Sequence, residues 1–248
     1  MTHFNHLGFG RGQPLPVLEQ VTDATGVRHY NTPTGKKYPS VTTVLAQHNK
    51  DVIDAWRARV GEAEANAISR RAAGRGTGVH LATERYLDNQ PPWTAGSFVN
   101  PLVKESFTHL QPLLDRIDNI HCQETRMFSH HLRLAGTVDC IAEFDGKLSV
   151  IDFKTSGKAK KKEWISSYFM QCAAYAVMYE ELTGIPIARL VVLISVEEDT
   201  EPQLFVERRD NWIPDLIKLR DQYEQSLLTD IDSVPTIAVY PDEGKIHE

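Results

Sequence analysis

The dipeptide Asp145-Gly146 lies between two segments in which apolar and polar residues alternate, and this feature most constrains the fold. An Asp-Gly pair between two strand-like segments is the strongest short signal for a β-hairpin with a two-residue turn. Such a turn pairs Phe144 with Lys147, so the numbers of facing residues add up to 291. By this register Asp139 is predicted to face Asp152 on the neighbouring strand.

The predicted hairpin brings two carboxylates together on one face of a sheet. Opposed side chains on neighbouring strands have Cβ atoms about 4.5–5.5 Å apart, and like charges there are destabilising. Ala135 and Ile141 share the face of Asp139, which argues against the alternative of a solvated polar face. A bound divalent cation balances the repulsion better, because Mg²⁺ prefers oxygen ligands from carboxylates, water and phosphate. Lys154 follows Asp152 by two residues, so it is placed to contact a phosphate or an attacking water near that cation.

Turn residues and apolar periodicity divide the rest of the chain into helices and strands. A small hairpin is predicted over 27–38, and the Gly- and Pro-containing residues 1–26 before it are predicted to form a loosely packed N-terminal extension. Helices are predicted over 41–45, 51–73, 77–87, 102–117, 163–183 and 211–228, with a break at 74–78. Further strands are predicted over 124–128, 133–144, 148–155, 188–196 and 203–207.

This order of elements predicts an α/β fold, with a central mixed β-sheet flanked by helices and an N-terminal helical part. One domain is expected over 27–228, with its helical part at about 39–117 and its sheet core at about 122–210. The last residues, 229–248, are predicted to form a C-terminal tail.

The net charge of −6, from 27 Lys+Arg and 33 Asp+Glu, argues as a whole-chain value against a nucleic-acid partner. Its distribution changes that conclusion. Residues 1–162 carry 21 basic and 16 acidic side chains, a balance of +5, whereas residues 163–248 carry 6 and 17, a balance of −11. A polarised surface is therefore expected. Phosphate contacts are predicted, against the alternative of solvated surface charges, for Lys158, Lys160, Lys161, Lys162, Arg57 and Arg75.

Composition and cysteine spacing exclude several classes of protein. No apolar run approaches the roughly 18 residues of a membrane span, so no membrane partner is expected. The three cysteines (Cys122, Cys140 and Cys172) form no CxxC pair, which argues against a disulfide framework and excludes a four-thiolate iron–sulfur cluster. The N-terminus lacks a signal or transit peptide, which favours the cytoplasm of a bacterial or phage-infected cell over a mitochondrion.

Four motifs, in the expected order, resemble the PD-(D/E)XK nuclease superfamily. Gly136-Thr-Val-Asp139 followed by Ile151-Asp-Phe-Lys-Thr-Ser156 resembles its core, and Gln171 with Tyr175 resembles the Q-x-x-x-Y element of its RecB-type branch. Upstream, Gly76-Thr-Gly-Val-His80 resembles that branch's helical G-T-x-x-H element. Tyr38-Pro-Ser-Val-Thr42 and Trp56-Arg57 narrow the resemblance to the mitochondrial genome maintenance exonucleases and their phage counterparts, over about residues 27–196.

The resemblance implies a restriction-endonuclease-like core and Mg²⁺- or Mn²⁺-dependent hydrolysis of phosphodiester bonds in DNA. Single strands, free ends or flaps are the implied substrates, in replication, recombination or repair. The implied metal ligands are His80, Asp139, Asp152 and the carbonyl oxygen of Phe153. The implied catalytic residues are Asp139, Asp152, Lys154, Gln171 and Tyr175.

Several roles and activities stay open at this point. Imidazole suits Mn²⁺ better than Mg²⁺, and a structural role is the alternative for His80. Gln171 is predicted to contact Lys154, a metal-bound water or the DNA backbone, and Glu84 is a candidate to support the metal ligands. Glu124 has no assigned role. A flap endonuclease, a non-catalytic nucleic-acid-binding module and a hydrolase of small phosphates are the alternatives to an exonuclease.

Overall fold

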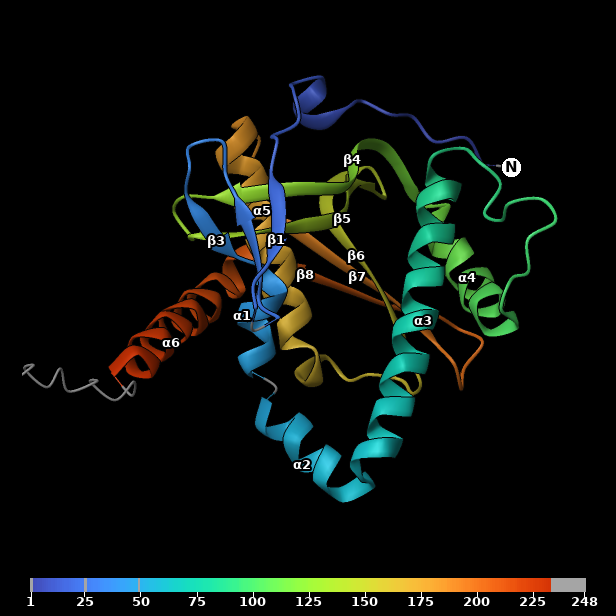
Figure 1. Cartoon of the computed structure of the whole chain (residues 1–248). Helices are drawn as coiled ribbons and strands as arrows, with labels where there is room; N and C mark the ends of the chain where they lie inside the picture. The colour runs from blue at the N-terminus through green and yellow to red at the C-terminus, as the bar shows by residue number, and fades with distance from the viewer. Residues whose placement is uncertain (1, 25, 49, 233–248) are drawn as a thin grey trace, which may run out of the picture.

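A five-stranded mixed sheet forms the centre of the computed structural model, which describes residues 2–24, 26–48 and 50–232 (Figure 1). β6 (Lys147–Ser156) and β7 (Arg189–Val196) are parallel and the other neighbours are antiparallel. The apolar sequence of β7 is explained by this position, because a strand covered on both faces is apolar throughout. The predicted α/β class and mixed sheet are confirmed. In spatial order the strands are β4 (Ile117–Ser129), β5 (Leu134–Phe144), β6 (Lys147–Ser156), β7 (Arg189–Val196) and β8 (Gln203–Arg208).

The Asp145-Gly146 turn joins β5 to β6 with the predicted register. Phe144 pairs with Lys147, and the pairing continues to Cys140 and Ile151. Both turn residues have positive φ, 51° for Asp145 and 70° for Gly146, as a type I′ turn requires.

β5 and β6 separate where the two aspartates lie. Asp139 and Asp152 are next in register, but the strand pairing ends before them. Instead, Oδ2 of Asp139 accepts a hydrogen bond from the backbone nitrogen of Phe153 at 2.9 Å. Tyr175 packs against β5 just beyond this point, so closely that a Cβ atom at Gly136 would lie 2.9 Å from the tyrosine ring. The glycine is therefore required by the close approach of this side chain.

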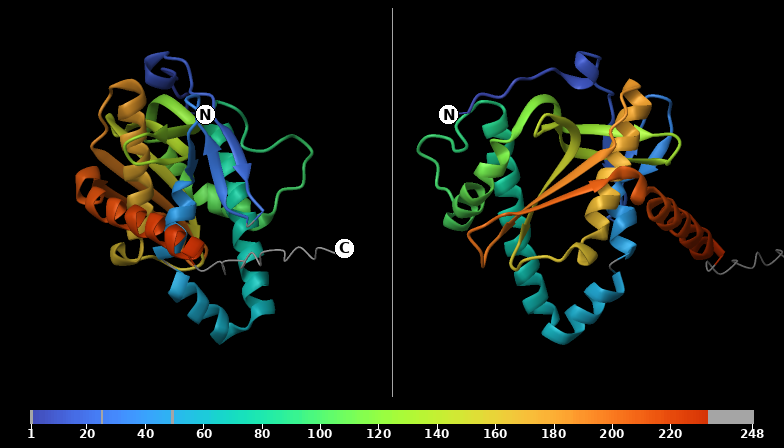
Figure 2. Two further views of the ribbon diagram at one scale, coloured as in Figure 1. Left: turned by 60° about the vertical axis from the view of Figure 1, so that its left-hand side comes forward. Right: turned by 180° about the vertical axis from the view of Figure 1, so that it is seen from behind.

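Helices cover both faces of the sheet (Figures 1 and 2). α5 (Ser166–Thr183) packs its buried residues on one face, against β5, β6 and β7. α3 (Glu62–Leu87) and α4 (Pro101–Leu114) cover the other face. α1 (Val41–His48) and α6 (Ile213–Asp232) pack on α5. Across the described residues, no helix combines the length and apolar character needed to span a bilayer.

α3 is one continuous helix, so the predicted break at 74–78 is wrong. Glycine costs about 1 kcal/mol relative to alanine within a helix, but it does not end a helix that is held by packing. Val79 and Tyr86 supply that packing on the buried side of α3. The break lies earlier, at Gly61 (φ 87°), between α2 (Lys50–Val60) and α3.

The first residues of the chain are packed, contrary to the predicted loose extension. Phe4 and Phe9 are buried, and the ring of Phe4 meets that of Tyr86 edge to face at 5.3 Å between centroids. Isolated phenylalanines in a Gly- and Pro-containing segment show no periodicity, which is why the sequence pattern did not indicate this packing.

The predicted hairpin at 27–38 is part of a three-stranded sheet. β2 (Arg28–Asn31) pairs with β3 (Lys37–Pro39) as expected, and β1 (Glu19–Thr22) adds a third strand on the other edge of β2. Tyr30 of β2 is fully buried against β5 at Ala135. At the other end of the chain, α6 runs past the predicted helix end, and residues 233–248 of the predicted tail lie outside the described residues.

Gly78 allows α3 to approach α4. A Cβ atom at Gly78 would lie 2.8 and 2.9 Å from the two methyl carbons of Val103. We therefore expect Gly78→Ala to lower the free energy of unfolding by about 1–3 kcal/mol, as overpacking does, despite the better helix propensity of alanine. The double variant with Val103→Ala should lose less unfolding free energy than the sum of the losses in the two single variants, because the smaller side chain removes the clash. Urea unfolding followed by circular dichroism measures all three variants.

Gly74 provides the matched control on the same helix. A Cβ atom at Gly74 would have no neighbour within 4 Å. Gly74→Ala should therefore stabilise the chain by about 0.5–1 kcal/mol. Equal stabilisation by Gly78→Ala would contradict the close contact with Val103.

Candidate active site

Acidic side chains from three neighbouring strands form a row across the sheet. The β4–β5 pairs on either side place Glu124 opposite Asp139, and the hairpin places Asp152 next to Asp139 on the other side. Glu124 has a φ of 41°, in the left-handed region that non-glycine residues seldom adopt. Such a conformation costs of order 1–3 kcal/mol and clusters at functional sites. Its role was unassigned from the sequence, since no short motif contains it.

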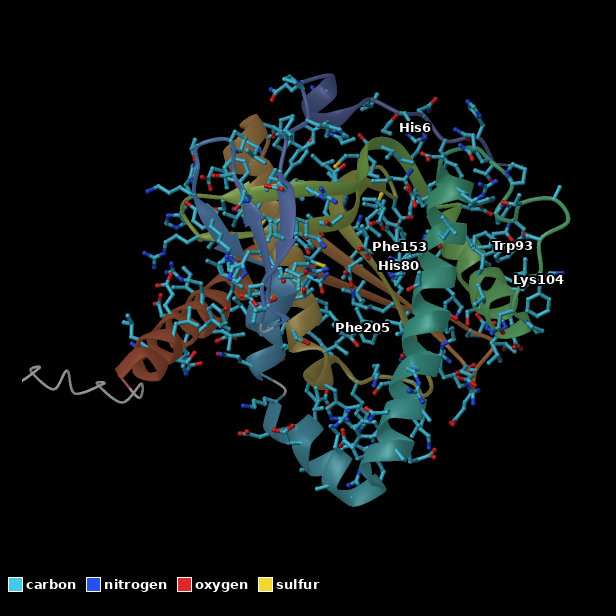
Figure 3. All side chains as sticks on the ribbon, viewed as in Figure 1. His6, His80, Trp93, Lys104, Phe153 and Phe205 are labelled. Carbon is cyan, nitrogen blue, oxygen red and sulfur yellow. The ribbon has the colours of Figure 1, made fainter. Side chains whose placement is uncertain are left out.

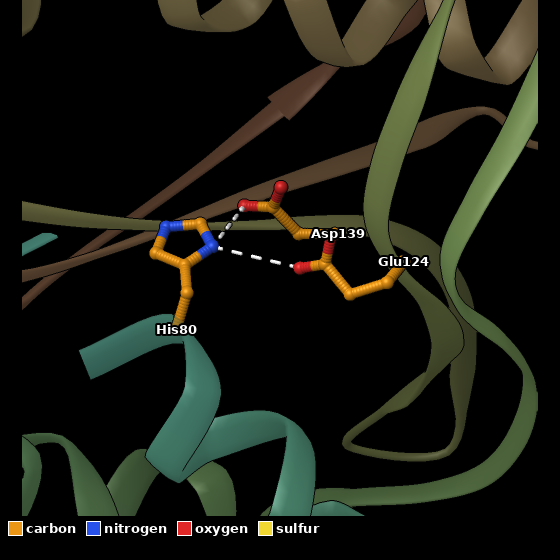
Figure 4. A group of neighbouring side chains, drawn as sticks. All are labelled: His80, Glu124 and Asp139. Carbon is orange, nitrogen blue, oxygen red and sulfur yellow. Dashed lines mark ion pairs between the residues drawn. The ribbon is translucent and has the colours of Figure 1, made fainter. Parts of the chain in front are cut away.

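His80 reaches this row from α3 (Figures 3 and 4). Its Nδ1 lies 3.7 Å from Oε1 of Glu124 and 3.8 Å from Oδ2 of Asp139. Its Nε2 lies 2.7 Å from the carbonyl oxygen of Phe153. An Nε2–H that donates to this carbonyl leaves Nδ1 directed at the two carboxylates.

His80, Glu124 and Asp139 form a group that could hold a metal ion, with one potential ligand atom from each residue within 4.8 Å of the others. Two carboxylates suit Mg²⁺ or Mn²⁺, and the imidazole nitrogen suits Mn²⁺ better. The contact from Nε2 to Phe153 is the kind of second hydrogen bond that orients a metal-binding histidine. The donor set and its orientation therefore fit a divalent cation.

The charges of the cluster favour a protonated histidine. Burial lowers the pKa of His80, but the hydrogen-bonding interaction with Glu124 and the charge of Asp139 outweigh it and raise the pKa to about 9. The imidazolium thus offsets carboxylate charge at neutral pH. A cation and a proton compete for Nδ1, because a metal ligand must present the neutral ring.

A pocket of about 480 Å³ opens beside this cluster. Gly76 and Thr77 line it together with His80, so the predicted G-T-x-x-H element forms one wall. Glu84 lines it as well, and burial followed by the charges of Glu124 and Asp88 raises the pKa of Glu84.

Asp152 has a different set of contacts, and its predicted role as a metal ligand, like that of the Phe153 carbonyl, stays a prediction. It is 2% exposed; its Oδ1 accepts a hydrogen bond from Nε2 of Gln171 at 3.0 Å, and its Oδ2 lies 2.5 Å from Nζ of Lys154. Gln171 therefore contacts Asp152, where the sequence predicted Lys154, a metal-bound water or DNA. The physical reason is that α5 lies over β6, which brings the buried amide onto the buried carboxylate.

The pKa values of this pair move in directions set by burial and by each other. Burial raises the pKa of Asp152 to about 7, and the Lys154 ammonium opposes that rise. For Lys154, burial lowers the pKa, but Asp152 and then Asp139 outweigh it, so the net pKa is raised. The ammonium form of Lys154 is therefore favoured at neutral pH. It also lies over the ring of Tyr168, 5.2 Å from the centroid.

Tyr175, the other member of the predicted Q-x-x-x-Y element, is buried against Gly136. Burial, and then the charges of Asp139 and Asp152, raise the pKa of its hydroxyl well above the usual value. The structure thus places Tyr175 as a neutral packing residue behind the site. Its predicted catalytic role stays a prediction.

The predicted DNA-binding lysines lie on the segment that joins β6 to α5. Lys162 forms an ion pair with Glu207, and Nζ of Lys158 lies 3.9 Å from Glu198. Nζ of Lys161 lies over the ring of Trp164, 5.2 Å from its centroid. Lys160 is held through its backbone, which exchanges two hydrogen bonds with the side chain of Gln203.

The two predicted arginines have acidic partners. Arg57 pairs with Glu62. Arg75 is only 7% exposed and pairs with Glu197, which also pairs with Arg71. The predicted phosphate contact of Arg75 stays a prediction, and in the structure its guanidinium joins α3 to Glu197, the residue that follows β7.

The expected polarised surface also needs correction. Several acidic side chains from the negative part of the chain, after residue 162, form ion pairs with basic side chains from the positive part. These acidic residues are Glu197, Glu198, Glu207 and Glu224. The charge asymmetry along the sequence is therefore partly cancelled in space.

Fold and site together match one superfamily of nucleases. The family model of the PD-(D/E)XK nuclease superfamily matches residues 44–238, so the chain belongs to this superfamily, as its motifs predicted. The chain is 31% identical over 149 residues to Mitochondrial genome maintenance exonuclease 1 of Homo sapiens. The matched region covers 55% of this chain and 42% of that protein. The Mus musculus counterpart is 32% identical over 132 residues, 49% of this chain and 38% of that protein. The chain thus spans about two fifths of the length of these relatives.

Removal of a ligand from the cluster should weaken metal binding. We expect Glu124→Gln and Asp139→Asn each to reduce Mn²⁺ affinity at least about 100-fold, because each removes a charged oxygen ligand. Isothermal titration calorimetry measures the affinity. Glu105→Gln, an exposed charge removal on α4, is the control and should bind like the unmodified chain. Unchanged affinity in Glu124→Gln would exclude Glu124 as a ligand.

Proposed function

We propose that this chain is a deoxyribonuclease that uses Mg²⁺ or Mn²⁺ to degrade single-stranded DNA from free ends. The observation that carries the proposal is the cluster of His80, Glu124 and Asp139 beside the buried Asp152–Lys154 pair. Membership of a nuclease superfamily and the exonuclease name of two relatives support the choice of reaction. Such an activity would serve DNA replication, recombination or repair.

His80, Glu124 and Asp139 would hold the cation. When bound, the cation acts as a Lewis acid that polarises the scissile phosphate and offsets negative charge in the transition state. The backbone of Phe153 fixes two of these side chains, because its nitrogen donates to Asp139 and its carbonyl accepts from His80. The cluster is thereby oriented before substrate arrives, which is the arrangement that electrostatic catalysis requires.

Lys154 would act as a cation. Its raised pKa favours the ammonium, which can donate a hydrogen bond to a phosphate oxygen and stabilise the negative charge that develops there. Removing a proton from the hydrolytic water is disfavoured for a lysine in this form. Gln171 would keep Asp152 oriented toward Lys154 through its bond to Oδ1.

An end-dependence assay tests the proposal. The substrates are an end-labelled linear single strand and a circular single strand of the same sequence, each with Mg²⁺, Mn²⁺ or EDTA. We expect loss of the linear strand with either metal and persistence of the circle. Asp139→Asn should lower the rate at least about 1,000-fold and Lys154→Met at least about 100-fold, because each removes transition-state stabilisation. Asp51→Asn, an exposed charge removal on α2, should cleave at the unmodified rate.

The other outcomes identify the alternatives. Cleavage of circles would replace the exonuclease by an endonuclease, and cleavage confined to branched substrates would indicate a flap endonuclease. Binding of DNA without cleavage under any metal condition would indicate a non-catalytic module. Full activity of Asp139→Asn would contradict the assigned site.

A further inference from the structure

Aromatic and polar side chains form a stripe that leads from the surface to the candidate active site. Trp164 ends the short helix η2 (Lys162–Trp164), and Ile165 separates it from α5. Tyr168, Gln171 and Tyr175 follow on α5 at spacings of three and four residues, which places these three side chains on one side of the helix, and Trp164 precedes Tyr168 by four residues. Burial increases along the stripe, from 62% exposed at Trp164, through a half-buried Tyr168, to 8% exposed at Gln171.

The inner end of the stripe touches the reacting groups. Gln171 donates to Asp152, and Tyr168 lies under the ammonium of Lys154, which is paired with the same carboxylate. Trp164 therefore lies four residues before a side chain that contacts Lys154.

The outer end of the stripe is cationic. Lys161 places its ammonium over the indole of Trp164, and the half-buried Lys160 and the exposed Lys158 precede it on the same segment. Figure 1 shows this segment crossing beneath the sheet from the end of β6, next to α3, to the start of α5. A large exposed aromatic ring beside cations matches what a single strand offers, since each nucleotide combines a base with a flat face and a phosphate.

We infer that Trp164 is a base-stacking residue, which holds an unpaired nucleotide near the scissile phosphate while Lys161 neutralises the adjoining backbone. Tyr168 provides the next surface along the path to Lys154. Stacking requires a base that has left the duplex and tolerates any sequence, so this residue would favour single-stranded substrate without reading bases. The inference rests on the proposed nuclease function and adds the element that selects unpaired DNA.

Binding in EDTA isolates this contact from cleavage. The probes are a short oligothymidylate and an abasic strand of equal length, which carries the same phosphates without bases. Fluorescence anisotropy measures both dissociation constants. We expect Trp164→Ala to weaken oligothymidylate binding about 10-fold, as loss of one stacked base does, and to change abasic-strand binding less than about 2-fold. Trp164→Phe should retain most of the affinity, which separates stacking from a folding defect.

Trp93 provides the matched control, because it packs on Phe107 on the α4 side of α3, away from the stripe (Figure 3). Trp93→Phe should bind both strands like the unmodified chain, and quenching of tryptophan fluorescence by oligothymidylate should be lost only in the Trp164 variants. Equal affinity of Trp164→Ala and the unmodified chain, or equal loss on both strands, would overturn the inference. Absence of cleavage with any metal, together with the expected binding pattern, would reject the nuclease function but still support the stacking role of Trp164.

Discussion

Repulsion among carboxylates from three neighbouring strands is the constraint on which the rest of the site depends. His80 from α3 offsets the negative charge of Glu124 and Asp139, and Lys154 offsets that of Asp152 on its own strand. Gln171 of α5 completes the contacts of Asp152. Because α3 and α5 cover opposite faces of the sheet, both helices dock on it partly through the polar groups of the site.

The separation of β5 from β6 makes this arrangement possible. Two strands that stayed paired would use the backbone of Phe153 for ladder hydrogen bonds. Here its nitrogen and carbonyl are bonded by Asp139 and His80, so side chains of the site replace the partner strand. Tyr175 packs on Gly136 just beyond this point, and any larger residue there would clash with its ring. Buried backbone groups remain satisfied although the ladder ends.

The sequence predicted those parts of the fold and site that depend on local chemistry. Asp145-Gly146 determined the hairpin register, and the spacing around Asp139, Asp152 and Lys154 indicated the carboxylate pair. Local sequence patterns did not predict contacts between segments that are distant along the chain. Glu124 belongs to no recognisable motif, and its own backbone is in the left-handed region. The ion pair of Arg75 with Glu197 joins segments 122 residues apart. Glycines likewise suggested a break in α3 that packing against α4 overrides.

A crystal structure soaked with Mn²⁺, with an anomalous difference map recorded at the manganese edge, tests the central claim most directly. We expect a peak coordinated by Nδ1 of His80 and by carboxylate oxygens of Glu124 and Asp139, with the Phe153 carbonyl still accepting from Nε2. A peak elsewhere on the protein, or an empty cluster at saturating Mn²⁺, would contradict the assignment of these residues as the metal site.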